Sequence, residues 1–188
     1  MSIKKVDIRF VTLIAIIVVA AFSRLVPHLP NFSPLGAIGL FGAAHFSKKW
    51  QAIAIPLSAT WLSDLYINNV IYAQYYPQFT WLSQGFYWQY GSYVLITIAG
   101  MLIFNKITPT RVLGGALTST AIFFAVSNFG CWPGSSYPQN IPGLMQCYVA
   151  GIPFLKGTLL GDLFYSTLLF GSFALAQKKY RVLAPARA

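Results

Sequence analysis

Charged side chains are scarce in this sequence. Lysine, arginine, aspartate and glutamate make up 9% of the 188 residues, whereas a typical soluble domain carries about 25%. Hydrophobic residues make up 56%, and the mean hydropathy is +0.61. This composition excludes an ordinary soluble domain and predicts one integral membrane domain over residues 1–188.

Carboxylates and catalytic motifs are scarcer still. The acidic side chains are Asp7, Asp64 and Asp162, and neither HExxH nor GxSxG occurs. The stretch GIPFLKGT resembles a phosphate loop, but its lysine precedes the glycine, which reverses the required order. Because acid–base chemistry needs more titratable groups than this, we expect no enzyme, no catalytic residue and no cofactor. If the protein moves a solute uphill, the energy must come from a partner or an ion gradient.

Cysteine is limited to Cys131 and Cys147, sixteen residues apart. A disulfide and two free thiols both remain open for this pair. Ligand spacing typical of zinc is absent, so we expect no metal site of the protein's own.

The basic residues are sorted among alternate gaps between apolar segments. Cytoplasmic loops retain lysine and arginine, so these gaps and both termini are expected on the inside. This topology and anionic lipid explain the net charge of +10, and we expect no nucleic-acid partner. The groups are Lys4, Lys5 and Arg9; Lys48 and Lys49; Lys106 and Arg111; and Lys178, Lys179, Arg181 and Arg187.

A chain with both termini on the inside crosses the membrane an even number of times, and the six apolar segments of this sequence meet that condition. The second is short for a bilayer that needs about 20 residues, so it is either tilted or partly buried by its neighbours, and its glycines favour burial. The sequence therefore predicts an all-α integral membrane protein, a bundle of six transmembrane helices with cytoplasmic termini. The predicted spans are 10–26, 35–46, 51–67, 88–104, 112–129 and 151–176.

Pairs of small residues four positions apart occur in three of these segments. Such pairs let two helix backbones approach closely in lipid. We expect them to hold the bundle together, and a docking surface for another subunit is the alternative. The pairs are Gly39 with Ala43, Gly115 with Ser119, and Gly157 with Gly161.

Three loops on the predicted outer side, 27–34, 68–87 and 130–150, contain no charged residue. They are rich in aromatic side chains, among them Trp81 and Trp132. An interfacial aromatic belt explains rings near span ends. Two uncharged loops of about twenty residues favour a lid over a ligand instead, because long loops in compact domains are usually functional.

Four charges, Arg24, Asp64, Lys156 and Asp162, lie toward this outer side. Ionisable groups at membrane depth indicate function by default, and a structural ion pair from Arg24 to either acid is the alternative. Neutral polar residues add to the same layer, which suits an uncharged or zwitterionic molecule with a ring. The candidate binding residues are Arg24, His28, Asn31, Asp64, Trp81, Asn128, Trp132, Tyr137, Asp162 and Tyr165.

Several stretches carry a family resemblance: RLVPHLPNFSPLGAIGLFGAAHF from residue 24, WLSDL from 61, SNFGCWPG from 127 and GIPFLKGTLLGDLFYSTLLFG from 151. They resemble a bacterial family of small membrane proteins similar to the S components of energy-coupling factor vitamin transporters. The resemblance implies a multi-pass protein of the bacterial inner membrane. It also implies a subunit that binds a small-molecule substrate, a vitamin or its precursor, under outer loops. A separate transmembrane coupling subunit with ATPases then completes uptake.

The first helix departs from this family. Many S components carry two alanines separated by three residues there for docking, whereas Ala15, Ala20 and Ala21 lie out of that spacing. A protein that works alone therefore stays open, as in some cobalamin-transporting relatives, with His28, Cys131 or Cys147 as candidate cobalt ligands. A gradient-coupled carrier that uses Asp64 and Asp162 also stays open, as do a structural membrane protein and a lipid enzyme.

Overall fold

The computed structural model describes residues 7–184 and contains helices but no strand in that range. The segments Ile8–Leu25, Pro109–Cys131 and Ile141–Lys179 are long and apolar enough to cross a membrane. These features confirm the prediction of an all-helical membrane protein, and each predicted segment overlaps one of the six α-helices. The helices are α1 (Ile8–Phe22), α2 (Leu35–His45), α3 (Lys49–Tyr66), α4 (Phe86–Ile103), α5 (Pro109–Cys131) and α6 (Ile141–Lys179).

Short helical turns extend three of these helices. A 3-10 turn, Ser23–Leu25, follows α1, and another, Arg181–Leu183, follows α6. A π-helical turn, Ile67–Ile71, continues α3, and a 3-10 turn, Ala73–Tyr75, comes next. The long connection between α3 and α4 is therefore partly helical where the sequence predicted a loop.

Side-chain caps define where three of the helices begin. The Asp7 carboxylate accepts from the Phe10 backbone N–H at 3.1 Å at the start of α1. Thr108 and Asn140 cap α5 and α6 in the same way, and each of these helices has proline in its first turn. Asx and Thr caps satisfy backbone donors that have no partner within the helix. One of the three carboxylates is thereby assigned to helix capping.

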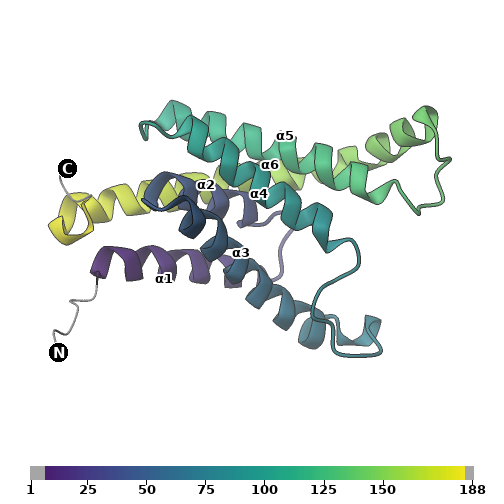
Figure 1. The fold of residues 1–188 in the computed structure, drawn as a ribbon, viewed down its shortest axis with the longest axis horizontal. Coiled ribbons are helices and arrows are strands. Elements are labelled where there is room, and N and C mark those ends of the chain that lie inside the picture. The colour runs from purple at the N-terminus through teal and green to yellow at the C-terminus, as the bar shows by residue number, and fades with distance from the viewer. Residues whose placement is uncertain (1–6, 185–188) are drawn as a thin grey trace.

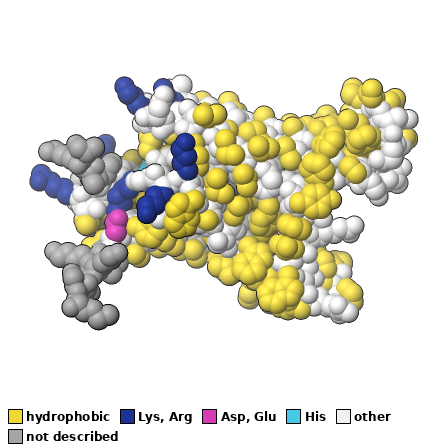
Figure 2. All heavy atoms as spheres, viewed as in Figure 1, with side chains coloured by type: hydrophobic (Ala, Val, Ile, Leu, Met, Phe, Trp, Pro, Cys, Tyr) yellow, Lys and Arg dark blue, Asp and Glu magenta, His cyan; other side chains and the backbone are white. Residues whose placement is uncertain are grey.

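Consecutive α-helices run in alternating directions, so α1 begins and α6 ends at the same end of the molecule (Figure 1). Arg9 Nε donates to the Leu183 carbonyl at 3.2 Å and links these two ends. On the face shown in Figure 2, the lysines and arginines gather at this end, whereas hydrophobic side chains cover most of the rest. Within residues 7–184, the basic residues seen on this face therefore gather at one end, which agrees with the charge sorting; Lys4, Lys5 and Arg187 lie outside the described residues.

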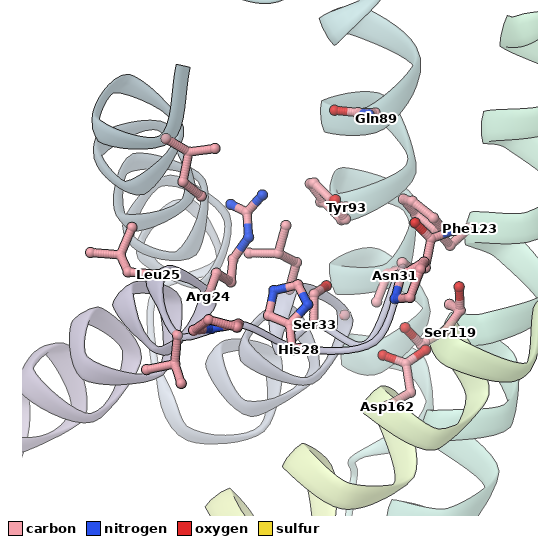
Figure 3. A pocket seen from close by; sticks show the side chains of 18 of the residues that line it. Arg24, Leu25, His28, Asn31, Ser33, Gln89, Tyr93, Ser119, Phe123 and Asp162 are labelled. Atoms are coloured by element: carbon pink, nitrogen blue, oxygen red, sulfur yellow. The ribbon is translucent and has the colours of Figure 1, made fainter. Parts of the chain in front are cut away.

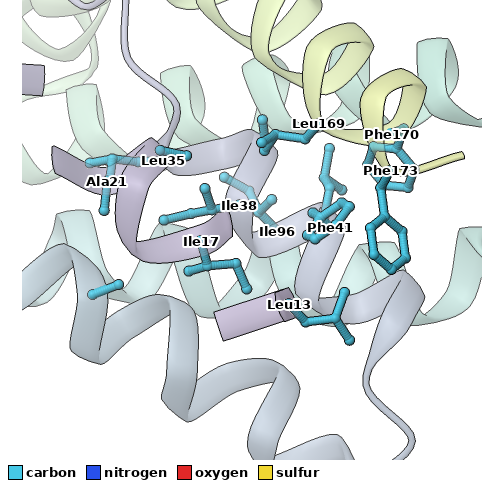
Figure 4. Close-up of a cluster of buried hydrophobic side chains, with 14 of the residues drawn as sticks. Leu13, Ile17, Ala21, Leu35, Ile38, Phe41, Ile96, Leu169, Phe170 and Phe173 are labelled. Carbon is cyan, nitrogen blue, oxygen red and sulfur yellow. The ribbon is translucent and has the colours of Figure 1, made fainter. Parts of the chain in front are cut away.

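Helix α2 lies at the centre of the packing. Its eleven residues rise about 16 Å, roughly half of the 30 Å hydrocarbon core, and nine of them are buried. Phe41 packs edge-on against Phe170 and Phe173 of α6, and Ile38 lies in the same cluster as Ile17 of α1 (Figure 4). Burial by neighbouring helices is therefore how this short segment is accommodated.

The predicted loop 130–150 is wrong over most of its length. Helix α5 continues to Cys131 and α6 already begins at Ile141, so nine residues connect them. The Asn140 cap and Pro142 are helix-start signals, and they outweigh the polar composition that suggested a loop. Cys131 and Cys147 are both free thiols, so the disulfide that the sequence allowed is not formed.

Candidate functional site

A cavity of about 620 Å³ lies on the side of α2 away from the basic end, and Figure 3 shows the side chains around it. Its wall is made by the loop between α1 and α2, the first turn of α2, the turn after α3, and helices α4, α5 and α6. Sites for organic ligands usually measure about 300–1,000 Å³ and combine apolar walls with a few polar groups. The cavity has the size and the mixed lining of such a site.

Prolines determine the form of the loop 26–34, which covers one side of the cavity. Pro27, Pro30 and Pro34 disfavour a continued helix, and Asn31 adopts the left-handed conformation with φ of 60°. Asparagine tolerates that conformation better than most residues. Irregular backbone within a membrane protein is stable where it is buried in protein or lines an aqueous cavity. The cavity therefore accounts for the interruption between α1 and α2.

Two glycines of α6 hold this loop against the helix. A Cβ atom at Gly157 would overlap the Pro30 carbonyl oxygen, and one at Gly161 would lie 2.8 Å from the Ser33 nitrogen. Gly157 and Gly161 therefore form a glycine seat for the loop backbone. The sequence predicted that this pair packs against another helix, and that prediction is wrong because the loop occupies the position.

An ion pair lies at the edge of the cavity. Arg24 Nη1 donates to Asp64 Oδ1 at 2.7 Å and to Ser63 Oγ at 3.0 Å. The Tyr90 hydroxyl donates to Asp64 Oδ2 at 2.8 Å, so both carboxylate oxygens are engaged. The two charged side chains are 17% and 18% exposed. Arg24 thus lines the cavity with its charge already compensated.

A second carboxylate lies deeper and has no such partner. Asp162 is 3% exposed, and its Oδ2 accepts from Thr120 Oγ1 at 2.8 Å. The neighbouring Ser119 is 1% exposed, and its hydroxyl has no hydrogen-bond partner within the described chain. Gly36 leaves room for both side chains, because a Cβ atom there would overlap Ser119 Oγ and Asp162 Oδ1. Within residues 7–184 the Arg24–Asp64 contact is the one ion pair.

Aromatic rings form part of the wall near Asp162. The rings of Tyr93 and Phe123 are stacked with centroids 5.7 Å apart and planes 8° from parallel. Both line the cavity, as does Gln89. The sequence analysis missed these residues because they lie inside predicted spans, where aromatic side chains are usual. Ser92 and Thr97 are polar residues near Tyr93 in an otherwise apolar segment. They could have indicated that this face of α4 is buried against other helices.

The structure brings together some of the ten predicted site residues. Arg24, His28, Asn31 and Asp162 line the cavity, and Asp64 lies behind Arg24. Tyr165 supports the loop, since its hydroxyl accepts from Ser23 Oγ at 3.1 Å and its ring lies 5.5 Å from that of Phe32. Like Asp64 and Tyr165, the remaining four predicted residues do not line the cavity, and neither does the exposed Lys156; the four are Trp81, Asn128, Trp132 and Tyr137.

Local contacts occupy three of these four residues. Trp81 is 62% exposed, and its backbone carbonyl accepts from Trp61 Nε1 at 3.1 Å. Trp132 Nε1 donates to the Pro138 carbonyl at 3.0 Å and closes the turn between α5 and α6. Asn128 Nδ2 donates to the Phe124 carbonyl at 2.8 Å. These contacts tie the residues to neighbouring turns and helices, and the loop 26–34 covers one side of the cavity instead.

Fold and site together define a helical membrane protein with a ligand-sized cavity between its helices. The chain belongs to a family of unknown function (DUF6580), whose sequence model matches residues 4–185. No curated protein and no solved structure matches the chain.

Proposed function

We propose that this protein is the substrate-binding subunit of a transporter in the bacterial inner membrane. Its substrate would be a small organic micronutrient, a vitamin or a precursor, and a separate coupling subunit with ATPases would supply the energy. The observation that carries the proposal is the cavity of about 620 Å³ under the loop 26–34. A cavity with few convergent polar groups, set within a helical bundle, is the usual form of a small-molecule site.

The arrangement of helices supports an outward-facing site. In the proposed topology all six α-helices cross the membrane and both termini are cytoplasmic. The basic end would then face the cytoplasm, in keeping with the positive-inside rule. Because the loop 26–34 follows α1, which begins at the basic end, the cavity would be reached from outside. A micronutrient would therefore meet the site before it meets the coupling module.

Cysteine labelling tests this topology. Cys131 is exposed where α5 ends, and Ser47 is exposed in the basic turn between α2 and α3. In a Cys147→Ser background, we expect a membrane-impermeant maleimide to label Cys131 in intact spheroplasts. Ser47→Cys, made in a chain without the native cysteines, should be labelled only after permeabilisation. The opposite pattern would overturn the proposed orientation.

Mass spectrometry of the purified protein tests the binding function. We expect protein from cells grown in rich medium to release a small organic molecule on denaturation, because a binding site partly covered by the loop 26–34 retains a tightly bound ligand through purification. The same compound should raise the melting temperature of the emptied protein. An empty protein that shows no thermal shift with a vitamin panel would contradict the proposal. Gradient-driven uptake by proteoliposomes without an ATPase would favour a solitary carrier over a subunit.

A further inference from the structure

The inner end of the cavity holds a carboxylate without a compensating cation. Asp162 Oδ2 accepts from Thr120 Oγ1 at 2.8 Å, and within the described residues no lysine or arginine pairs with this carboxylate. The adjacent Ser119 hydroxyl is also without a partner. Burying an ionised carboxylate is costly unless it is paired. The cavity therefore contains a buried carboxylate and a buried hydroxyl that a bound ligand could contact.

The other charged groups around the cavity do not neutralise Asp162. Arg24 is held by Asp64 at 2.7 Å, so that pair contributes no net charge. Lys156 is exposed and does not line the cavity. His28 directs Nδ1 toward its neighbour's backbone, the Leu29 carbonyl, at 3.0 Å. Within residues 7–184, Asp162 is thus the one charged side chain of the lining that has no oppositely charged partner.

The neighbouring aromatic wall suits the same kind of ligand. Figure 3 shows Tyr93 and Phe123 on the side of the cavity that also holds Asn31, Ser119 and Asp162. Aromatic faces attract cations and stack on rings. The Asn31 side chain supplies an amide beside this wall. Negative charge, aromatic faces and neutral hydrogen-bonding groups therefore converge in one half of the cavity.

We propose that this half of the cavity selects an organic cation, a ring-bearing molecule with a protonated nitrogen. One N–H of that nitrogen would donate to Asp162 Oδ1 and a second to Ser119 Oγ. The inference rests on the proposed binding function and names its substrate class. It replaces the expectation of an uncharged or zwitterionic ligand, which counted Lys156 among the site charges.

Three indole compounds of matched size test the charge preference: tryptamine, a cation, tryptophol, its neutral hydroxyl analogue, and indole-3-acetate, an anion. Binding to the purified, emptied protein is measured by calorimetry. We expect tryptamine to bind at least about tenfold more tightly than tryptophol, since a charge-assisted hydrogen bond exceeds a neutral one by that order. Asp162→Asn should remove this difference and leave tryptophol binding within about threefold.

Two further variants control for structure. Asn can still accept from Thr120 and is less costly to bury than a carboxylate, so Asp162→Asn should melt no lower than the wild type. Ser119→Ala should weaken tryptamine binding by a smaller factor and keep the preference for the cation. Thr167→Val, on the same helix but outside the cavity lining, should bind all three compounds as the wild type does.

The outcomes separate this inference from the proposed function. Equal or tighter binding of tryptophol or indole-3-acetate would overturn the cation preference while supporting a binding protein. If none of the three binds, the charge at pH 7 of the molecule that co-purifies decides: a cation supports the inference, and a neutral or anionic molecule overturns it. A protein that co-purifies empty and binds none of the compounds would overturn both.

Discussion

Arg24→Ala is expected to lower the free energy of unfolding by about 2–3 kcal/mol. The substitution leaves the Asp64 carboxylate with its Tyr90 hydrogen bond but without its cation. Breaking a buried pair by removing one partner costs about 3–5 kcal/mol. The side chains are 17% and 18% exposed, so we place the effect below that range. Chemical denaturation in detergent micelles, followed by circular dichroism, measures it.

The double variant Arg24→Ala/Asp64→Asn is the control for this prediction. It removes both charges, so it should cost less than the two single substitutions added together, as expected for residues in contact. Single variants that each stay within about 0.5 kcal/mol of the wild type, a range typical of neutral surface changes, would show that the pair contributes little. In that case the Arg24–Asp64 pair would not have a stabilising role, and ligand contact would be the better explanation for Arg24 in the cavity wall.

Gly157→Ala is expected to displace the loop 26–34 and to reduce ligand retention at least about tenfold, a loss of about 1.4 kcal/mol. The added Cβ would overlap the Pro30 carbonyl oxygen, and backbone cannot yield as a flexible side chain does. Gly171→Ala is the matched control on the same helix, because a Cβ there meets nothing within 4 Å. The amount of co-purified ligand per protein, measured by mass spectrometry, gives the comparison.

Helix stability distinguishes the two alanine variants as well. Alanine in place of an exposed helical glycine stabilises by about 0.5–1 kcal/mol, so Gly171→Ala should melt slightly higher than the wild type. Gly157→Ala should melt lower despite the same gain in helix propensity. If both variants retained ligand and melted alike, the close approach of loop and helix would not matter for binding.

Charge and apolar length predicted the helices well, because both are local properties of the sequence. The basic residues at 48–49 and 106–111 mark turns between helices, and Pro27 marks the end of the first. The polar composition of residues 130–150 predicted a loop there, but α6 already begins at Ile141, where the Asn140 cap and Pro142 determine the boundary. The buried position of α2 was favoured by its glycines, since close packing needs small side chains.

The site was harder to predict because it depends on which faces meet. Arg24, His28, Asn31 and Asp162 were found from their unusual chemistry in an apolar chain. Trp81 and Trp132 were chosen as aromatic rings in uncharged loops, but the Trp81 carbonyl accepts from the Trp61 ring N–H and the Trp132 ring N–H donates to the Pro138 carbonyl. Tyr93, Ser119 and Phe123 are ordinary residues for a membrane helix. Only the approach of α4, α5 and α6 around the cavity brings them into the wall.

The three prolines of the loop 26–34 have a consequence for the thermodynamics of binding. Proline fixes φ and so reduces the number of conformations that a chain segment can adopt. A loop with Pro27, Pro30 and Pro34, lying on Gly157 and Gly161, has already lost most of the entropy that closing over a ligand would remove. Less of the interaction free energy is then spent on ordering the protein, which is the general advantage of a preorganised site.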